Sequence, residues 1–274
     1  MRICFLLVHR VPPVPNAVTL EAFEILRRQG FEVESRMAEE HVHRPDLLEV
    51  EHDLYVLKSY TEMSLSLAGA LHARGARMLN PYPVCAALQN KVVTARLLSA
   101  AGIPAPRTWV TNELSSIAPL LEDGPLVVKP YLGHGAVAVR VVRDAAELTS
   151  AGEGPGPFVV QELVTGPEVQ LKVYVIGEHA FGIRKPFSSR SFADHGRSVA
   201  LDPDVHDIAL RCGRSLGLGL YGLDVIETAD GPVVIDVNYV AGYRGVPDAA
   251  ALLADYVAAY ARGTVELAPV AQLS

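Results

Sequence analysis

The sequence predicts an α/β protein in which a small α/β layer precedes a larger part of α+β character. Apolar runs of strand length alternate with helical patterns through the first third of the chain, which is typical of a parallel sheet. Strand patterns punctuated by glycine then dominate the middle of the chain. Two late strand patterns carry acidic residues among apolar neighbours, which indicates a sheet face with a function beyond packing.

The first third has the periodicity of a small α/β unit. Strand patterns lie at residues 3–8, 31–34 and 53–57, and helical patterns lie at 20–26 and 65–73. Gly30 and Gly75 follow the two helical patterns, and glycine commonly ends a helix at this position. We therefore expect an N-terminal α/β domain with a parallel sheet over residues 1–85.

The remainder of the chain is expected to form two α+β subdomains. Helical patterns lie at 88–101, 205–218 and 248–262, and strand patterns at 126–129, 136–142, 158–162, 172–176, 179–183, 221–227 and 233–237. Gly177-Glu178 separates two of these strands and predicts a hairpin. We expect a central subdomain at 86–163, a C-terminal subdomain at 164–266 and a tail at 267–274.

Composition and charge narrow the functional classes. The net charge of −7 provides no general basic surface for nucleic acid or an anionic membrane, so any phosphate-binding region must be a local pocket. Cys4, Cys85 and Cys212 lie far apart and include no CxxC pair, which fits a reducing cytosol. The apolar run at 3–8 is too short to span a membrane. We expect a cytoplasmic protein with no nucleic-acid or membrane partner; the oligomeric state is not predicted.

Two segments near the end of the chain suggest a metal site. Alternation along a strand places Asp236 and Asn238 on one face, and Asp224 lies beside them if the two strands pair as a hairpin. Buried carboxylates are costly unless they are paired or bound to a cation, and an oxygen-only donor set favours magnesium. The alternative is that these residues are structural carboxylates satisfied by hydrogen bonds.

Two lysines are candidates for phosphate contacts. Lys129 closes an apolar strand and precedes the glycine-flanked turn Gly133-His134-Gly135, where backbone N–H groups can approach phosphate oxygens. Lys91 on the helix at 88–101 is a similar candidate, although lysines in either position are commonly solvated. Gln161-Glu162 ends another apolar strand and forms either the edge of an adenine pocket or an ordinary strand end.

Taken in order, these segments resemble the ATP-grasp superfamily over residues 80–262. The resemblance rests on Asn90-Lys91, Val127 to Pro130 with His134-Gly135, Gln161-Glu162, Asp224 and Asp236-Val237-Asn238. It implies the ATP-grasp fold, with a small parallel α/β domain followed by two α+β subdomains that clasp ATP. It also implies that Lys91 and Lys129 contact the ATP phosphates, with His134 and Gly135 in the flap. The strand of Gln161 and Glu162 would hold adenine, and Asp224, Asp236 and Asn238 would bind Mg²⁺, for which Mn²⁺ can substitute.

Within the superfamily, the chain is most similar to the inositol-trisphosphate 5/6-kinase branch, with the ribosomal-protein glutamate-ligase-like branch second. The segments 172–178 and 236–243 resemble the central strand and the last motif of the kinases, but Ala241 replaces the usual proline and a second flap histidine is missing. The resemblance implies a kinase that transfers the γ-phosphate of ATP to a small phosphorylated polyol such as an inositol phosphate. It makes Lys172 and Arg184 catalytic candidates, and the residues implied for this anionic substrate are Lys58, Lys172, Arg184, Lys185 and Gly242.

Two other functions compete with the kinase hypothesis. An ATP-grasp carboxylate–amine ligase acting through an acyl phosphate needs the same magnesium and lysines in its first half-reaction. A non-catalytic nucleotide-binding module is the third hypothesis. The letters of Gly213 to Gly217 match a hydrolase G-x-S-x-G elbow, but they follow a helical pattern instead of a strand, which argues against a hydrolase.

Overall fold

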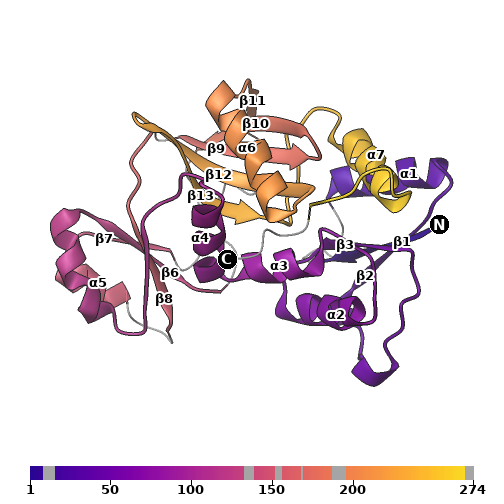
Figure 1. The fold of residues 1–274 in the computed structure, drawn as a ribbon, viewed down its shortest axis with the longest axis horizontal. Helices are drawn as coiled ribbons and strands as arrows, with labels where there is room; N and C mark the ends of the chain where they lie inside the picture. The colour runs from indigo at the N-terminus through magenta and orange to yellow at the C-terminus, as the bar shows by residue number, and fades with distance from the viewer. Residues whose placement is uncertain (9–15, 133–138, 152–155, 168, 187–195, 269–274) are drawn as a thin grey trace.

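The computed structural model describes residues 1–8, 16–132, 139–151, 156–167, 169–186 and 196–268. Within these residues the strands form three sheets, which follow one another along the long axis of the molecule (Figure 1). The first sheet lies at one end, a large antiparallel sheet lies in the middle and a small antiparallel sheet lies at the other end. This arrangement agrees with the predicted parallel α/β layer followed by parts of α+β character.

The first sheet is parallel and has the strand order β2-β1-β3-β4. Its strands are β1 (Arg2–Leu7), β2 (Glu32–Met37), β3 (Leu54–Lys58) and β4 (Met78–Leu79), with helices α1 (Ala17–Arg28) and α2 (Glu62–Ala73) and 3₁₀ turns η1 (Ala38–Glu40) and η2 (Pro45–Leu47). Every residue of β3 is buried, as expected for an inner strand of a parallel sheet. The Asn16 side chain accepts a hydrogen bond from the Thr19 N–H and caps α1.

The small sheet is antiparallel and has the order β5-β8-β6-β7. Its elements are β5 (Thr108–Thr111), η3 (Leu114–Asp123), β6 (Leu126–Pro130), β7 (Arg140–Val142), α5 (Ala145–Ala151) and β8 (Phe158–Glu162). It has a core of its own, in which Leu126, Val128 and Leu148 are at most 2% exposed and against which Trp109 packs. The sequence patterns did not predict β5 or α5.

The large sheet is antiparallel and has the order β11-β10-β9-β12-β13. Its elements are β9 (Val169–Ile176), β10 (His179–Pro186), β11 (Arg197–Val199), α6 (Pro203–Leu216), β12 (Leu220–Thr228) and β13 (Gly231–Asn238), and α7 (Ala249–Ala261) follows. The helix α6 buries Ile208 and Cys212 in the same core as Val173 and Leu223 of the sheet. The helix α7 packs against α1 of the first sheet.

The helix predicted at 88–101 is present but begins later than predicted, because a separate helix ends directly before it. The helix α3 (Tyr82–Gln89) ends at Asn90 and α4 (Lys91–Ala100) begins directly after it. Asn90 is extended, and its side-chain oxygen accepts hydrogen bonds from the N–H groups of Val92 at 3.0 Å and Val93 at 3.4 Å. The asparagine therefore caps α4 and fixes the helical position of the candidate phosphate lysine Lys91.

The first and large sheets share their cores. One buried cluster joins Cys4 and Leu57 of the first sheet to Val173 of the large sheet, and a second joins Phe5 to Leu253 of α7. Among the described helices, none is both long enough and apolar enough to cross a membrane.

Replacing Asn80 by alanine is expected to destabilise the junction between these two sheets. Asn80 is 1% exposed, and its side-chain oxygen accepts hydrogen bonds from the N–H groups of Gly219 at 2.8 Å and Leu220 at 3.0 Å. Its amide also donates to the Leu220 carbonyl at 2.6 Å. Because the variant leaves buried backbone groups without partners, we expect the free energy of unfolding in urea to fall by about 3 kcal/mol. The exposed Asn112→Ala control should change it by less than about 0.5 kcal/mol.

Candidate active site

The acidic residues meet on one face of the large sheet in two cross-strand rows. The first row is Asp236 on β13, Asp224 on β12 and Lys172 on β9, which are register partners across the three strands. The second row, two residues further along each strand, is Asn238, Gly222 and Tyr174. Register partners project from the same face of a sheet, so both rows present their side chains together.

A β-bulge shapes this face beside the first row. Asp224 lies opposite Asp236, but Val225 lies opposite Val234, so Ile235 is an extra residue in β13. Val225 and Val234 are buried core residues, and the half-buried Ile235 lines a pocket together with Val234 and Asp236. The bulge thus adds an apolar side chain beside the acidic residues.

Each carboxylate of the first row is held by a lysine. Lys172 Nζ lies 2.6 Å from Asp224 Oδ1, and Lys91 Nζ lies 3.2 Å from Asp236 Oδ1. Burial raises the pKa of Asp224 above its ordinary value, and the Lys172 charge opposes that shift. Burial lowers the pKa of Lys172, but the Asp224 charge and hydrogen bond outweigh burial and raise the pKa overall. The Asp224 and Asp236 side chains keep 24% and 35% of their surface exposed, which leaves both accessible to a ligand.

The donor set on this face fits a hard cation. In the described part of the chain no three or more His, Cys, Asp or Glu side chains gather as a metal cluster. Asp224 and Asp236 instead offer carboxylate oxygens, and Asn238 offers an amide oxygen that also accepts a hydrogen bond from the Val240 N–H at 2.8 Å. Magnesium is commonly bound by one or two carboxylates and completes its shell with phosphates and waters.

A pocket adjoins the first row between the large and small sheets. Its polar lining is Lys91, Thr94, Thr108, Lys129, Gln161 and Asp236, and its apolar lining is Ala95, Leu98, Ala105, Pro106, Val234 and Ile235. An apolar cavity with a few convergent polar groups is the usual form of a small-molecule site. Burial lowers the pKa of Lys129, the Lys91 charge adds to this shift and Asp236 opposes it. A bound anion would therefore stabilise the charged form of Lys129.

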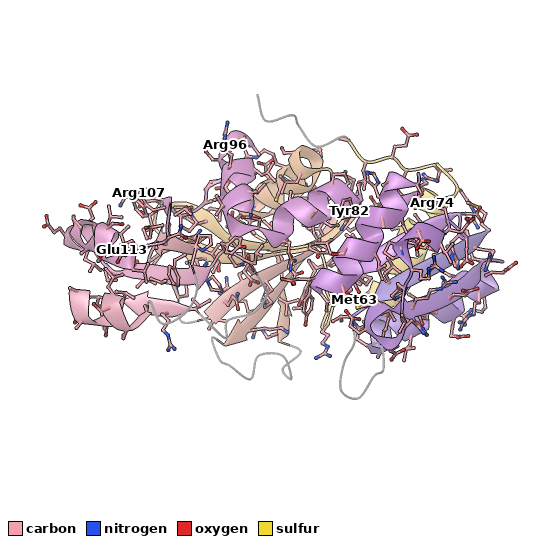
Figure 2. All side chains as sticks on the ribbon, turned by 90° about the horizontal axis from the view of Figure 1, so that it is seen from below. Met63, Arg74, Tyr82, Arg96, Arg107 and Glu113 are labelled. Carbon is pink, nitrogen blue, oxygen red and sulfur yellow. The ribbon has the colours of Figure 1, made fainter. Side chains whose placement is uncertain are left out.

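The two residues at the end of β8 point in different directions. Gln161 faces the pocket and accepts a hydrogen bond from Lys129 Nζ at 2.7 Å. Glu162 is opposite the core residue Leu126 in the sheet register and accepts from Arg107 Nε at 2.6 Å. Arg107 lies at the outer flank of the small sheet, on the same side as Glu113 (Figure 2). The structure thus brings the Gln161 side chain, and not that of Glu162, into the pocket.

The candidate basic pair on β10 is likewise divided between two faces. Lys185 shares the face of Ile183, which is the register partner of Lys172, and it is 3% exposed. Arg184 points to the opposite face, where its guanidinium lies 2.7 Å from Glu227 Oε2. The structure therefore does not bring Arg184 to the first row.

The last candidates lie where the first sheet meets the loop after β13. Lys58 is 5% exposed, donates a hydrogen bond to the Ala241 carbonyl and lies 4.8 Å from the centre of the Tyr243 ring. Gly242 follows in the same loop and is half-buried. His134 and Gly135 lie outside the described residues.

All five lysines of the chain are among these candidates, at positions 58, 91, 129, 172 and 185. Each is buried or half-buried, whereas the other basic positions are arginines. The sequence analysis missed Tyr174 and Ile235. Strand alternation from Lys172 was a signal that could have identified Tyr174, but no sequence signal marked the bulge at Ile235.

The comparisons with known proteins agree with this geometry. A family model described as an ATP-grasp domain matches residues 88–239. A protein named "Probable alpha-L-glutamate ligase 2" from Shewanella frigidimarina is 30% identical over 206 residues, covering 68% of this chain and 69% of its own length. A "Probable alpha-L-glutamate ligase" from Xanthomonas campestris is 28% identical over 207 residues, covering 69% of this chain and 70% of its own.

Solved structures share the fold at low sequence identity. A RimK domain ATP-grasp protein from Sphaerobacter thermophilus superposes with a TM-score of 0.76 at 22% identity, over 93% of this chain and 99% of its own. The D-cycloserine synthetase DcsG gives 0.72 at 17% identity, over 95% of this chain and 100% of its own. The D-alanine–D-alanine ligase of Bacillus anthracis in complex with ATP superposes with a TM-score of 0.69 at 18% identity, over 96% of this chain and 98% of its own.

These findings correct one prediction and establish another. The predicted kinase of the inositol-trisphosphate 5/6-kinase branch is wrong, because the similar curated proteins are named alpha-L-glutamate ligases and the solved neighbours include ligases. The ATP-grasp resemblance itself is confirmed by a family model that spans more than half of the chain, and enzymes of this kind use ATP and a divalent metal. The chain belongs to the ATP-grasp family.

Proposed function

We propose that this protein is an ATP- and Mg²⁺-dependent carboxylate–amine ligase that forms an amide through an acyl phosphate, with L-glutamate as one substrate. The observation that carries the proposal is the 30% identity to a probable alpha-L-glutamate ligase over 68% of the chain. The two carboxylates of the first row and the lysines that contact them, Lys91 and Lys172, offer the charges that such chemistry needs.

The nucleotide is proposed to bind in the pocket beside the first row. Lys91 and Lys129 reach this pocket and would neutralise phosphate oxygens, since phosphoryl transfer depends mainly on positioning and charge stabilisation. Asp224, Asp236 and Asn238 would hold Mg²⁺, or Mn²⁺ in its place. When bound, the cation would neutralise charge on the phosphates.

The proposed reaction has two steps, formation of the acyl phosphate and formation of the amide. A carboxylate oxygen of the acid attacks the γ-phosphorus, the bond to the β-phosphate oxygen breaks and ADP leaves. The amine nitrogen next attacks the acyl carbon, phosphate leaves with the former carboxylate oxygen, and the amine loses a proton to solvent. Lys172, one strand beyond Asp224 in the first row, would stabilise the negative charge on the transferring group.

The second substrate is expected to be anionic. Lys58 is buried against the loop after β13, and Lys185 is buried two residues along β10 from Ile183, the register partner of Lys172, so basic groups lie on either side of the first row. This expectation agrees with L-glutamate, which carries two carboxylates. A solved structure with this fold is the ATP-grasp ligase PsnB in complex with the precursor peptide PsnA2, so a peptide carboxylate is included among the candidate acids.

The test measures ADP release with L-glutamate and a panel of acids and peptides, each alone and in pairs. We expect turnover only with an acid–amine pair, formation of an amide seen by mass spectrometry, and loss of turnover with EDTA. An acid labelled with ¹⁸O in its carboxylate should transfer one label to inorganic phosphate. Turnover that needs a single acceptor and yields a stable phosphate ester would contradict the ligase.

A further inference from the structure

Three polar side chains on the pocket face of the small sheet come from three neighbouring strands. Thr108 on β5 is the register partner of Gln161 on β8, and Gln161 is the register partner of Val127 on β6. Lys129 lies two residues beyond Val127, so strand alternation places it on the same face, diagonal to Gln161. Thr108, Gln161 and Lys129 all line the pocket proposed for the nucleotide.

A chain of hydrogen bonds joins these three side chains in a fixed order. Lys129 Nζ lies 2.7 Å from Gln161 Oε1, and Gln161 Nε2 lies 3.0 Å from Thr108 Oγ1. Thr108 Oγ1 in turn lies 2.9 Å from the Pro106 carbonyl oxygen. A lysine ammonium only donates, so the Gln161 oxygen accepts from Lys129 and the Gln161 amide group donates to Thr108. The Thr108 hydroxyl then donates to the backbone carbonyl, which determines the orientation of the Gln161 amide.

The opposite face of the small sheet holds these strands in place. Val128 and Val160 are register partners that alternate with the residues of the chain, and they are buried with Leu148 of α5 in the core of this sheet. Positions on strands that pack on a core are more precise than positions on loops. The lysine side chain is nevertheless long and costly to order, so its contact with Gln161 preorganises the ammonium group of Lys129.

The partner of Lys129 in this chain is uncharged, which leaves the positive charge of the lysine available to a ligand. Asp236 also lines the pocket, but Lys91 Nζ lies 3.2 Å from its carboxylate. An amide oxygen aligns an ammonium group through a hydrogen bond without cancelling its charge. A carboxylate at position 161 would instead form an ion pair with Lys129, and a phosphate would have to compete with that pair.

We propose that Thr108 and Gln161 are positioning residues, which act through Lys129 to hold its ammonium group in the pocket for the phosphates of the nucleotide. The proposal rests on the nucleotide site proposed above. It gives the Gln161 side chain the role of aligning a cation, in place of a direct contact with the base. Thr108 sets the orientation of Gln161 from the neighbouring strand and so affects a lysine that lies two strands away.

The experiment compares the dissociation constants of ADP and adenosine, measured in the presence of Mg²⁺ by competition against a fluorescent ADP analogue. We expect Thr108→Val to raise the dissociation constant of ADP by about 3- to 10-fold, because one neutral hydrogen bond that orients the chain is lost. The dissociation constant of adenosine should not change, because adenosine has no phosphate for Lys129 to contact. Thr108→Ser keeps the hydroxyl and should match wild type.

Gln161→Glu tests the same chain with a substitution that keeps the shape of the side chain. We expect it to raise the dissociation constant of ADP by about 10- to 100-fold, because the introduced carboxylate pairs with Lys129. The dissociation constant of adenosine should again stay unchanged. This variant also tests the proposal if Thr108→Val does not fold.

A double-mutant cycle separates positioning from a purely structural role. In the Lys129→Met background, Thr108→Val should no longer change the dissociation constant of ADP, because the group that it positions is absent. A structural defect in the small sheet would instead weaken binding in both backgrounds. Thr149→Val is the matched control and should bind ADP as wild type does, since Thr149 is exposed on α5 and its hydroxyl also donates to a backbone carbonyl, that of Ala145.

Three results would overturn the positioning role while leaving the nucleotide site intact. The first is an unchanged dissociation constant of ADP in folded Thr108→Val or Gln161→Glu. The second is an equal rise for ADP and adenosine, which would mean that these side chains contact the base. The third is an equal effect of Thr108→Val with and without Lys129. A wild type that binds neither ADP nor ATP would instead contradict the nucleotide site and the proposed ligase function.

Discussion

Asp236→Asn is expected to reduce ATP turnover by about 10²- to 10³-fold while the protein stays folded. The substitution keeps the shape of the side chain but removes one of the two carboxylates offered to the metal, and stabilisation of developing phosphate charge is lost with it. Asp236 is 35% exposed and its amide replacement can still accept a hydrogen bond from Lys91, so the free energy of unfolding should change by no more than about 1 kcal/mol. The measurements are kcat for ADP release and urea unfolding.

Asp230→Asn, at the exposed turn of the same hairpin, is the control and should behave as wild type. A higher Mg²⁺ concentration should restore part of the activity of Asp236→Asn, because weaker binding is then offset by mass action. If activity and thermal stability fell together, Asp236 would be a structural carboxylate satisfied by Lys91, and the metal site would be ruled out.

Lys129→Met is expected to lower kcat/KM for ATP by about 10²-fold and yet to leave the ligand-free protein at least as stable as wild type. The lysine is a candidate phosphate contact in the pocket, so its loss removes charge stabilisation. In the folded chain, burial and the Lys91 charge disfavour its charged form and lower its pKa, with only partial compensation from Asp236. The charged Lys129 therefore destabilises the ligand-free wild type, and a bound anion would remove this destabilisation.

The pH dependence follows from the direction of this shift. The pKa of Lys129 is lower in the folded state than the ordinary value of 10.5, so the destabilisation is complete below the folded pKa and disappears as pH rises past 10.5. At pH 7 the free energy of unfolding in urea should be higher for Lys129→Met than for wild type. This difference between the two proteins should become smaller towards pH 10. Arg140→Met, an exposed change opposite Val128 on the neighbouring strand, controls for the added apolar surface. A large loss of stability in Lys129→Met at pH 7 would contradict this account.

Patterns of neighbouring residues along the chain were sufficient to predict individual strands and the ends of helices. Alternation and the glycines at positions 30 and 75 predicted the first sheet, and alternation along the last strand predicted that Asp236 and Asn238 share a face. The break at Asn90 was not predictable in the same way. Its bridge to Leu132 and the bond from the Lys91 N–H to the Tyr131 carbonyl join segments far apart in sequence.

The kinase prediction rested on the segments 172–178 and 236–243, and these segments include Lys172, Asp236 and Asn238 on the face that either activity would use. A kinase and a ligase both transfer the γ-phosphate to an oxygen, so Lys129, Asp224 and Asp236 fit either activity. The proposed acceptor side includes the loop after β13 and the end of β3, where Lys58 meets Ala241 over a separation of 183 residues. Arg184 and Lys185 also looked like a pair in the sequence, but successive strand residues face opposite ways.

The chain has only five lysines, and all of them are buried or half-buried candidate site residues, so labelling of lysine side chains reports on the site. An amine-acylating reagent has, apart from the α-amino group, only these side chains to modify, because arginine does not react as an amine at neutral pH. Peptide mapping by mass spectrometry after such labelling would then report ligand occupancy one lysine at a time. ATP is expected to shield Lys91 and Lys129 from the reagent, and the second substrate is expected to shield Lys58 beside Tyr243. Labelling would then show the order in which the two substrates bind.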